Sequence, residues 1–255
     1  MRFASLGSGS QGNGLVVEVG ASRVLLDCGF ALSDTVERLA RLGIEPSQLD
    51  AIIVTHEHDD HVGGVGRLAR EYDVPVWVTH GTLRAAERIL AGVERVHAIA
   101  SYMRFAVADI EVLPYAVPHD AREPAQFVFS DGEHRLGVLT DAGSLTPHIE
   151  AALSGCHALV LECNHDVDML HAGSYPETVK RRIAGRYGHL DNASAARLLC
   201  ALDTHRLQHV IAAHLSQQNN LPELARTALG GALGCDPEWV GVATQEHGFD
   251  WREIH

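Results

Sequence analysis

The chain has 255 residues, of which 46% are hydrophobic and 21% charged, so it can bury a full core and is too apolar to be disordered. Its formal net charge of -13 argues against a broad basic face that wraps duplex nucleic acid. With 17 histidines beside 20 lysines and arginines, the chain is also rich in imidazole and carboxylate, the ligands that favour a divalent-metal site.

The cysteines give no sign of a disulfide framework or a cysteine zinc site, because they are odd in number, scattered and free of any C-x-x-C spacing. They are Cys28, Cys156, Cys163, Cys200 and Cys235. A reducing cytoplasm is the expected compartment. No apolar stretch approaches 18 residues and the first residues run into glycine and serine, so neither a membrane span nor an export signal is expected.

The first third of the chain alternates short apolar runs with helical periodicity. Strands are predicted at residues 2–6, 15–19, 23–26 and 51–54, the last of them apolar enough to be buried on both faces. Helices are predicted at 34–42 and 62–72. The glycine-rich loop 7–13 predicts a tight hairpin, which is either a simple turn or a loop whose amides face a bound anion.

The alternation continues to the end of the chain. Further strands are predicted at 74–78, 105–113, 127–129, 136–139, 158–161 and 210–213, and helices at 83–90, 147–153, 193–202 and 222–229. No linker divides the chain. One α/β domain over residues 1–255, with more than one sheet, is therefore expected.

The clearest chemical signal is the run Thr-His-Glu-His-Asp-Asp-His at residues 55–61, directly after a predicted buried strand. So many groups with a desolvation cost indicate an open cleft or a metal site rather than a solvated loop with incidental histidines. In an extended backbone His56 and His58 point to the same side and can bind one ion together. Asp60 and His61, where the chain turns into a helix, are then free for a second ion.

Three isolated residues share the placement of this run, because His119, Asp141 and His214 each follow the end of an apolar segment. Taken singly, each is typical of a capping or hydrogen-bonded residue. The recurrence of one placement indicates that they meet at the same edge of the fold.

Together these residues resemble the metallo-β-lactamase-fold hydrolases over nearly the whole chain. The resemblance implies an αββα four-layer sandwich that carries two divalent metal ions, zinc or manganese. It implies that Asp27, at the end of an early strand, orients ligands from behind.

The same resemblance implies the ligand sets. It places His56, His58 and His119 on one ion. It places Asp60, His61 and His214 on the other, with Asp141 bridging both.

A narrower likeness is to the exonuclease-like YycJ/WalJ branch of this family. It rests on residues 5–13, 55–58, 162–166, 188–190, 214–216 and 219–220. The chain departs from that branch at Asp59 and Asp191, where serine is usual, and both departures leave the implied ligands intact.

Asp60 and His189 are the candidate catalytic residues. For a phosphodiester, a pair of bound ions activates water and absorbs charge, and an acid must protonate the leaving alkoxide. His189 resembles the histidine that does this in related phosphodiesterases; the alternative is a residue before a helix with no catalytic part. Glu162 and His165 are candidates for the substrate groove, although Glu162 could only cap a strand end.

The leading hypothesis is thus a dinuclear phosphodiesterase that acts as an exonuclease on nucleic acid, favouring single-stranded ends, with no membrane partner. DNA and RNA both stay open, and the sequence indicates no oligomeric state. The alternative is a thioester, lactone or β-lactam hydrolase that uses the same metals, since a fold does not decide its substrate. A metal-binding regulatory module is less favoured because all seven ligand positions are present.

Overall fold

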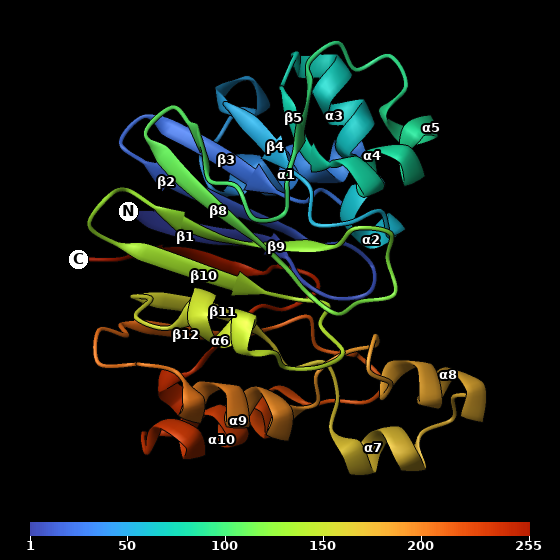
Figure 1. Ribbon diagram of the computed structural model, residues 1–255, viewed down its shortest axis with the longest axis vertical. Coiled ribbons are helices and arrows are strands. Elements are labelled where there is room, and N and C mark those ends of the chain that lie inside the picture. Colours follow the sequence, from blue (N-terminus) through green and yellow to red (C-terminus); the bar gives the residue numbers. More distant parts are fainter.

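The computed structural model describes all 255 residues, which form two mixed seven-stranded sheets (Figure 1). The first sheet has the order β14 (Phe249–Glu253), β1 (Arg2–Gly7), β2 (Gly14–Val19), β3 (Ser22–Leu26), β4 (Ala51–Ile53), β5 (Val76–Thr79) and β6 (Val96–Ile99). The second has the order β13 (Gly241–Val242), β12 (His209–Ala213), β11 (Ala158–Glu162), β10 (Arg135–Leu139), β9 (Ala125–Ser130), β8 (Ile110–Ala116) and β7 (Phe105–Val107).

Helices cover the outer faces of both sheets. In the first half of the chain they are α1 (Leu32–Arg41), α2 (Asp59–Val62), α3 (Val65–Tyr72), α4 (His80–Ala85) and α5 (Glu87–Leu90), with a short 3-10 turn at Pro46–Gln48. In the second half they are α6 (Pro147–Leu153), α7 (Val167–Ala172), α8 (Glu177–Ile183), α9 (Asn192–Ala201) and α10 (Pro222–Leu233), with a 3-10 turn at Pro237–Trp239. None of these helices has the length and apolarity needed to cross a membrane.

Three separate apolar clusters hold the layers together. One lies between the sheets, where Ile53 of the first sheet shares a buried cluster with Phe127 and Val160 of the second. The other two join each sheet to its own helices. Three interfaces require four layers, so the predicted αββα sandwich is confirmed.

Strand β4 shows why the sequence predicts this arrangement well. Its side chains alternate between two interfaces, since Ile52 packs toward the helices and Ile53 toward the opposite sheet. A strand buried on both faces needs apolar residues at every position, as the run at 51–54 predicts.

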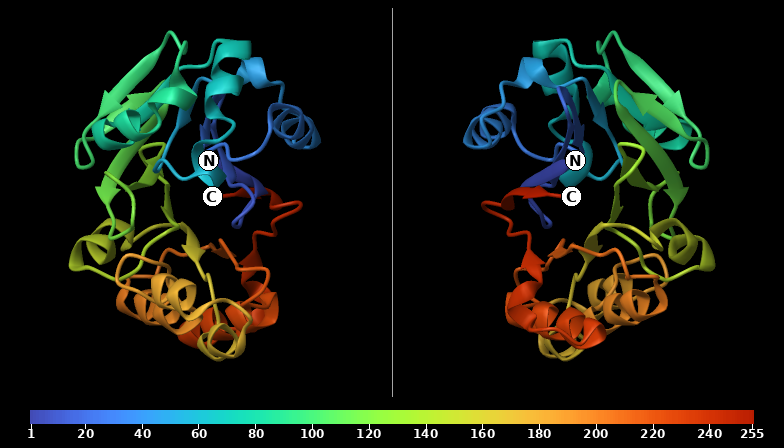
Figure 2. Two further views of the ribbon diagram at one scale, coloured as in Figure 1. Left: turned by 90° about the vertical axis from the view of Figure 1, so that its right-hand side faces the viewer. Right: turned by 90° about the vertical axis from the view of Figure 1, so that its left-hand side faces the viewer.

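The two sheets are built alike, which brings several strand ends to one edge. Strands β3, β4, β5 and β6 are parallel neighbours, as are β10, β11, β12 and β13. Strand β1 pairs with β14, so the two termini lie beside each other (Figure 2). The termini are at the edge opposite the carboxyl ends of β3 and β4, because β1 runs from Arg2 toward the loop after Gly7.

The sequence prediction was wrong where the chain breaks locally. The predicted strand 105–113 is two strands, β7 and β8, joined by a turn in which Ala108 has a φ of 47°. The predicted helix 62–72 is interrupted at Gly63 and Gly64, and the predicted helix 83–90 is interrupted at Ala86. Strands β6, β13 and β14 and helices α7 and α8 were not predicted, and each of them is at most seven residues long.

Candidate metal centre

The candidate site lies where parallel strands of both sheets end. Asp27 follows β3, Asp141 lies two residues after β10, and His214 follows β12. All three adopt left-handed backbone, with φ of 59°, 51° and 54°. Asp and His enter this region more readily than most residues, but it is still costly, and such strain gathers at functional sites.

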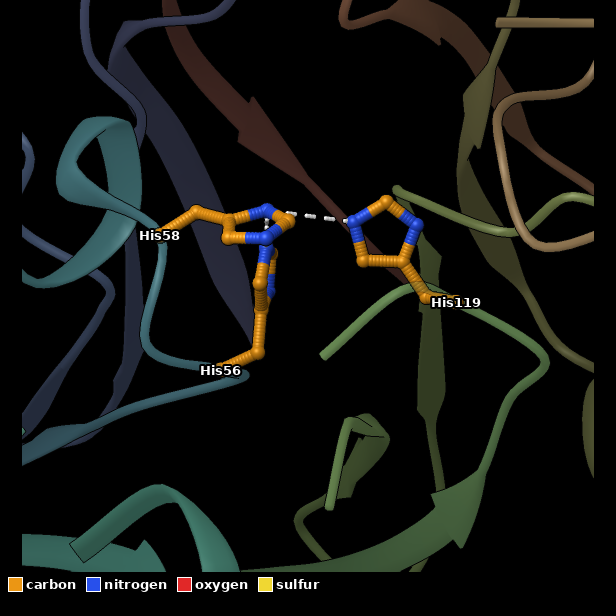
Figure 3. A group of neighbouring side chains, drawn as sticks. All are labelled: His56, His58 and His119. Atoms are coloured by element: carbon orange, nitrogen blue, oxygen red, sulfur yellow. Dashed lines mark hydrogen bonds between the residues drawn. The ribbon is translucent and has the colours of Figure 1, made fainter. Parts of the chain in front are cut away.

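Three imidazoles converge on one point, as Figure 3 shows. Nδ1 of His58 lies 3.0 Å from Nε2 of His56 and 3.3 Å from Nε2 of His119. Burial lowers the pKa of His56 well below its usual value and also lowers that of His119. His56 and His119 are therefore held neutral, which is the form that binds a metal ion.

A second group joins a carboxylate to two imidazoles. Oδ2 of Asp60 lies 3.5 Å from Nε2 of His61 and 3.4 Å from Nε2 of His214. Burial alone would raise the pKa of Asp60, but hydrogen bonds from His214 and His61 hold it well below its usual range. Asp60 is thus an anionic ligand available to a cation.

Asp141 joins the two groups. Its Oδ2 lies 3.0 Å from Nε2 of His61, and its Oδ1 lies 3.4 Å from Nδ1 of His214 and 3.9 Å from Nε2 of His119. Oδ2 is buried and forms no hydrogen bond. A buried carboxylate oxygen without a donor, facing ring nitrogens, is the arrangement that a bound cation completes, so this donor set fits divalent metal ions.

Asp27 and Thr55 support this arrangement from behind. Oδ2 of Asp27 lies 2.8 Å from Nδ1 of His61, while the amide and hydroxyl of Thr55 each donate to Asp27 at 2.8 Å. Because Nδ1 is held by a carboxylate, Nε2 of His61 is directed toward Asp60 and Asp141. The supporting role predicted for Asp27 matches these contacts.

The glycine-rich loop also supports the site. The side chain of Asn13 donates to the carbonyl oxygen of Asp60 at 3.2 Å and lies 3.1 Å from Nε2 of His61. The loop amides of Gly9, Gln11 and Gly12 all donate to acceptors within the protein. The alternative that this loop faces an anion is therefore wrong for these amides, and Asn13 is a site residue that the spacing did not identify.

The backbone at Gly29 packs closely against the backbone of Asp60. A Cβ atom at Gly29 would lie 1.9 Å from the carbonyl oxygen of Asp60, and backbone cannot yield as a flexible side chain does. We expect Gly29→Ala to displace Asp60, lower the metal content and destabilise the protein by about 1–3 kcal/mol. Metal analysis and thermal melting measure both effects.

The matched control is Gly231→Ala in α10, where nothing lies within 4 Å of the added Cβ. It should leave metal content unchanged and stabilise the protein by up to about 1 kcal/mol. Equal metal content and melting temperature in Gly29→Ala and the wild type would contradict the role given to Gly29.

Beside the metal centre, His189 pairs with Glu162. Nδ1 of His189 lies 2.9 Å from Oε1 of Glu162 and 3.3 Å from Oδ1 of Asp141. Burial disfavours the charged imidazole, but the Glu162 and Asp141 carboxylates outweigh it and raise the pKa of His189 to about 10. The His189 side chain stays 21% exposed, so it can meet a substrate.

Glu162 does more than cap the end of β11. It is fully buried, its Oε2 accepts from the amides of Ala142 and Leu190, and its Oε1 lies 3.2 Å from Nδ1 of His214. The positive charge of His189 and hydrogen bonds from both histidines lower its pKa to about 2, against the effect of burial. Glu162 thus fixes His189 from behind.

The structure brings all seven predicted ligands together, with His189 beside them. They are His56, His58, Asp60, His61, His119, Asp141 and His214.

Two residues near the site differ from the sequence prediction. His165 does not line an open groove as predicted, because it is 2% exposed and its backbone forms a β-bridge with Asp191. Asp120, 3.5 Å from His119 and paired with Arg182 at 2.6 Å, was missed because a lone surface aspartate gives no sequence signal.

Comparison with known proteins gives matches over most of the chain. The family described as "Beta-lactamase superfamily domain" matches residues 22–214. The exodeoxyribonuclease YycJ of Bacillus anthracis is 35% identical over 254 residues, covering 98% of this chain and 96% of that protein. The exodeoxyribonuclease WalJ of Streptococcus pneumoniae (strain D39) is 32% identical over 245 residues, covering 94% and 91%.

Solved structures match across the full length. Zn²⁺-bound PqqB from Methylobacterium extorquens has a TM-score of 0.77 at 18% identity, covering 100% of both chains. The metallo-β-lactamase-fold protein YhfI from Bacillus subtilis has a TM-score of 0.75 at 16% identity, covering 99% of both. At these identities the likeness shows the fold.

Proposed function

The chain belongs to the metallo-β-lactamase superfamily, and from that premise we propose that it is a dinuclear metal-dependent phosphodiesterase that removes nucleotides from nucleic acid ends. It is a hydrolase of this superfamily with clustered His and Asp metal-site residues. The predicted resemblance to YycJ and WalJ is confirmed, and both relatives are named exodeoxyribonucleases. In this proposal residues 1–255 act as one catalytic unit.

The observation that carries the proposal is the pairing of His189 with a buried carboxylate, next to the ligand that joins both clusters. Cleavage of a phosphodiester releases an alkoxide, a poor leaving group that needs a proton. A partly exposed imidazole, held protonated beside Glu162 and Asp141, is placed to supply one.

We assign the two ions as the resemblance implies. His56, His58 and His119 would hold one. Asp60, His61 and His214 would hold the other, with Asp141 shared. The chemistry such ions supply when bound is activation of water and polarisation of the phosphoryl oxygen. Imidazole-rich ligands suit zinc, and the carboxylates are equally compatible with manganese.

The chain's own residues orient this chemistry. Because Nδ1 of His189 is engaged by Glu162, the atom that carries a proton toward the leaving oxygen is Nε2. Asp27 and Thr55 fix the ring of His61, and Asn13 fixes the backbone of Asp60. These contacts hold the ligand side chains in position before the substrate binds.

A panel of end-labelled single- and double-stranded DNA and RNA tests the proposal. Protein loaded with zinc or manganese should release nucleotides from ends, with single-stranded DNA among the substrates cleaved. Intact oligonucleotides together with hydrolysis of a thioester, lactone or β-lactam would contradict the proposal and favour the alternative class.

A further inference from the structure

A short basic segment stands out in this acidic chain. Residues 180–186 hold four of the 20 lysines and arginines, including the only lysine, and no acidic residue. They are Lys180, Arg181, Arg182 and Arg186. In a chain of net charge -13 such a concentration is a strong local departure. Most of it belongs to α8, at the lower right edge of the molecule in Figure 1.

The segment runs directly into the candidate site. The amide of Asp120 donates to the carbonyl oxygen of Tyr187 at 3.0 Å. Nδ1 of His119 lies 3.0 Å from the carbonyl oxygen of Gly188. On the other side the chain rests on Gly143, where a Cβ atom would lie 2.3 Å from the amide nitrogen of Gly188. The backbone just before His189 is therefore fixed at the rim of the metal centre.

The basic side chains of this segment differ in their exposure and in their partners. Lys180 is turned inward, and its Nζ donates to the carbonyl oxygen of His171 at 2.7 Å. Arg182 is paired with Asp120 at 2.6 Å. Arg186, in contrast, is exposed and forms no ion pair with an acidic side chain. Only its carbonyl oxygen is engaged, by the hydroxyl of Ser144 at 3.1 Å.

Tyr187 follows Arg186 directly and is also exposed. Its side chain is 59% exposed although its backbone is held by Asp120. An exposed aromatic ring on a fixed backbone loses little freedom when a base stacks on it, and such stacking tolerates any base. The unpaired guanidinium of the preceding residue, Arg186, supplies the charge that a phosphate needs.

We propose that Arg186 and Tyr187 bind the nucleotide next to the scissile bond, the guanidinium holding its phosphate and the phenol ring stacking on its base. This inference rests on the proposed function and names how that site holds its substrate. It explains how a strand stays bound to a chain whose net charge of -13 disfavours phosphate. If Arg186 and Tyr187 were only solvated surface residues, removal of either side chain would leave substrate binding unchanged.

The test compares Arg186→Ala and Tyr187→Ala with the wild type on a labelled single-stranded DNA and on bis(p-nitrophenyl) phosphate, which has no neighbouring nucleotide. We expect kcat/KM for DNA to fall about tenfold more than kcat/KM for the small substrate in each variant. In Arg186→Ala the slope of log KM against log salt should also flatten by about 0.7, the value for one phosphate contact on a single strand.

The matched control is Arg252→Ala, an exposed arginine at the opposite edge, in register with Phe3. It should match the wild type on both substrates. Tyr187→Phe should retain DNA cleavage, since it keeps the ring.

Two outcomes separate this inference from the proposed function. If the wild type cleaves DNA but Arg186→Ala and Tyr187→Ala lose equal activity on both substrates, this inference alone is overturned. If the wild type cleaves no nucleic acid, the proposed function is overturned as well. The inference is also overturned if the wild type binds anionic vesicles or acidic peptides, the two alanine variants do not, and the DNA kinetics of the variants are unchanged. That result would assign the segment to another partner.

Discussion

Asp141→Asn is expected to lose about a hundredfold or more in hydrolysis of any phosphodiester and to retain less than the full metal content. Asp141 is the residue whose carboxylate approaches ring nitrogens of both clusters, at 3.0 Å from His61 and 3.9 Å from His119. Asparagine keeps the volume of the side chain and removes its charge. Both ions would then lose a shared anionic ligand.

Metal content by elemental analysis and kcat/KM on bis(p-nitrophenyl) phosphate measure the effect of Asp141→Asn. Asp250→Asn is the control, because Asp250 is exposed on β14 and forms no ion pair. A variant that keeps the wild-type metal content and rate would refute the shared position of Asp141.

The second large effect is expected for His189→Ala. With the imidazole removed, no group protonates the leaving alkoxide, and kcat on an oligonucleotide should fall about 10²–10⁴-fold. The fall should be much smaller on bis(p-nitrophenyl) phosphate, because p-nitrophenolate departs without a proton. Glu162→Gln should lower the rates on both the oligonucleotide and bis(p-nitrophenyl) phosphate, but by less than His189→Ala does. In that variant His189 keeps its ring and loses the carboxylate of Glu162 as a partner.

His205→Ala is the control for these variants, since His205 is an exposed histidine whose side chain contacts only Asp203 and Arg206, both on the surface. The two substrates are measured side by side in single-turnover reactions. Full oligonucleotide cleavage by His189→Ala would show that the acid is another group. Equal losses on both substrates would give His189 a role in metal binding or positioning instead.

The part of the site that the sequence predicts is the part that is local. His56, His58, Asp60 and His61 lie within six residues after one buried strand, so their proximity follows from the backbone. His214 was found by a weaker signal, an apolar strand that ends in a polar residue. Parallel strands align these ends at one edge, and therefore the fold class and the ligand set could be expected together.

The supports of the site could not be predicted in this way. Glu162 meets His189 across 27 residues, and Asn13 meets Asp60 across 47. Nothing in the neighbouring sequence marks either contact, because it depends on how distant loops pack. Helices α7 and α8 were missed for a related reason, since each is short and largely exposed and has no apolar face to give a period.

The net charge of the chain bears on which nucleic acids it can bind. At -13 it disfavours tight binding to long duplexes, as the sequence predicts. The basic segment at residues 180–186 leads directly into Tyr187 and Gly188, whose carbonyl oxygens contact Asp120 and His119 at the candidate site, where the scissile strand has to be held. A narrow contact with a strand end is compatible with an acidic protein.

The most direct test of a dinuclear nuclease is the rate of nucleotide release from end-labelled single-stranded DNA, measured on one preparation at known ratios of metal to protein. The account predicts that release rises as zinc or manganese is added and reaches its plateau at two ions per chain, with products shortened from an end. Protein that binds two ions per chain and leaves every labelled oligonucleotide intact would contradict it.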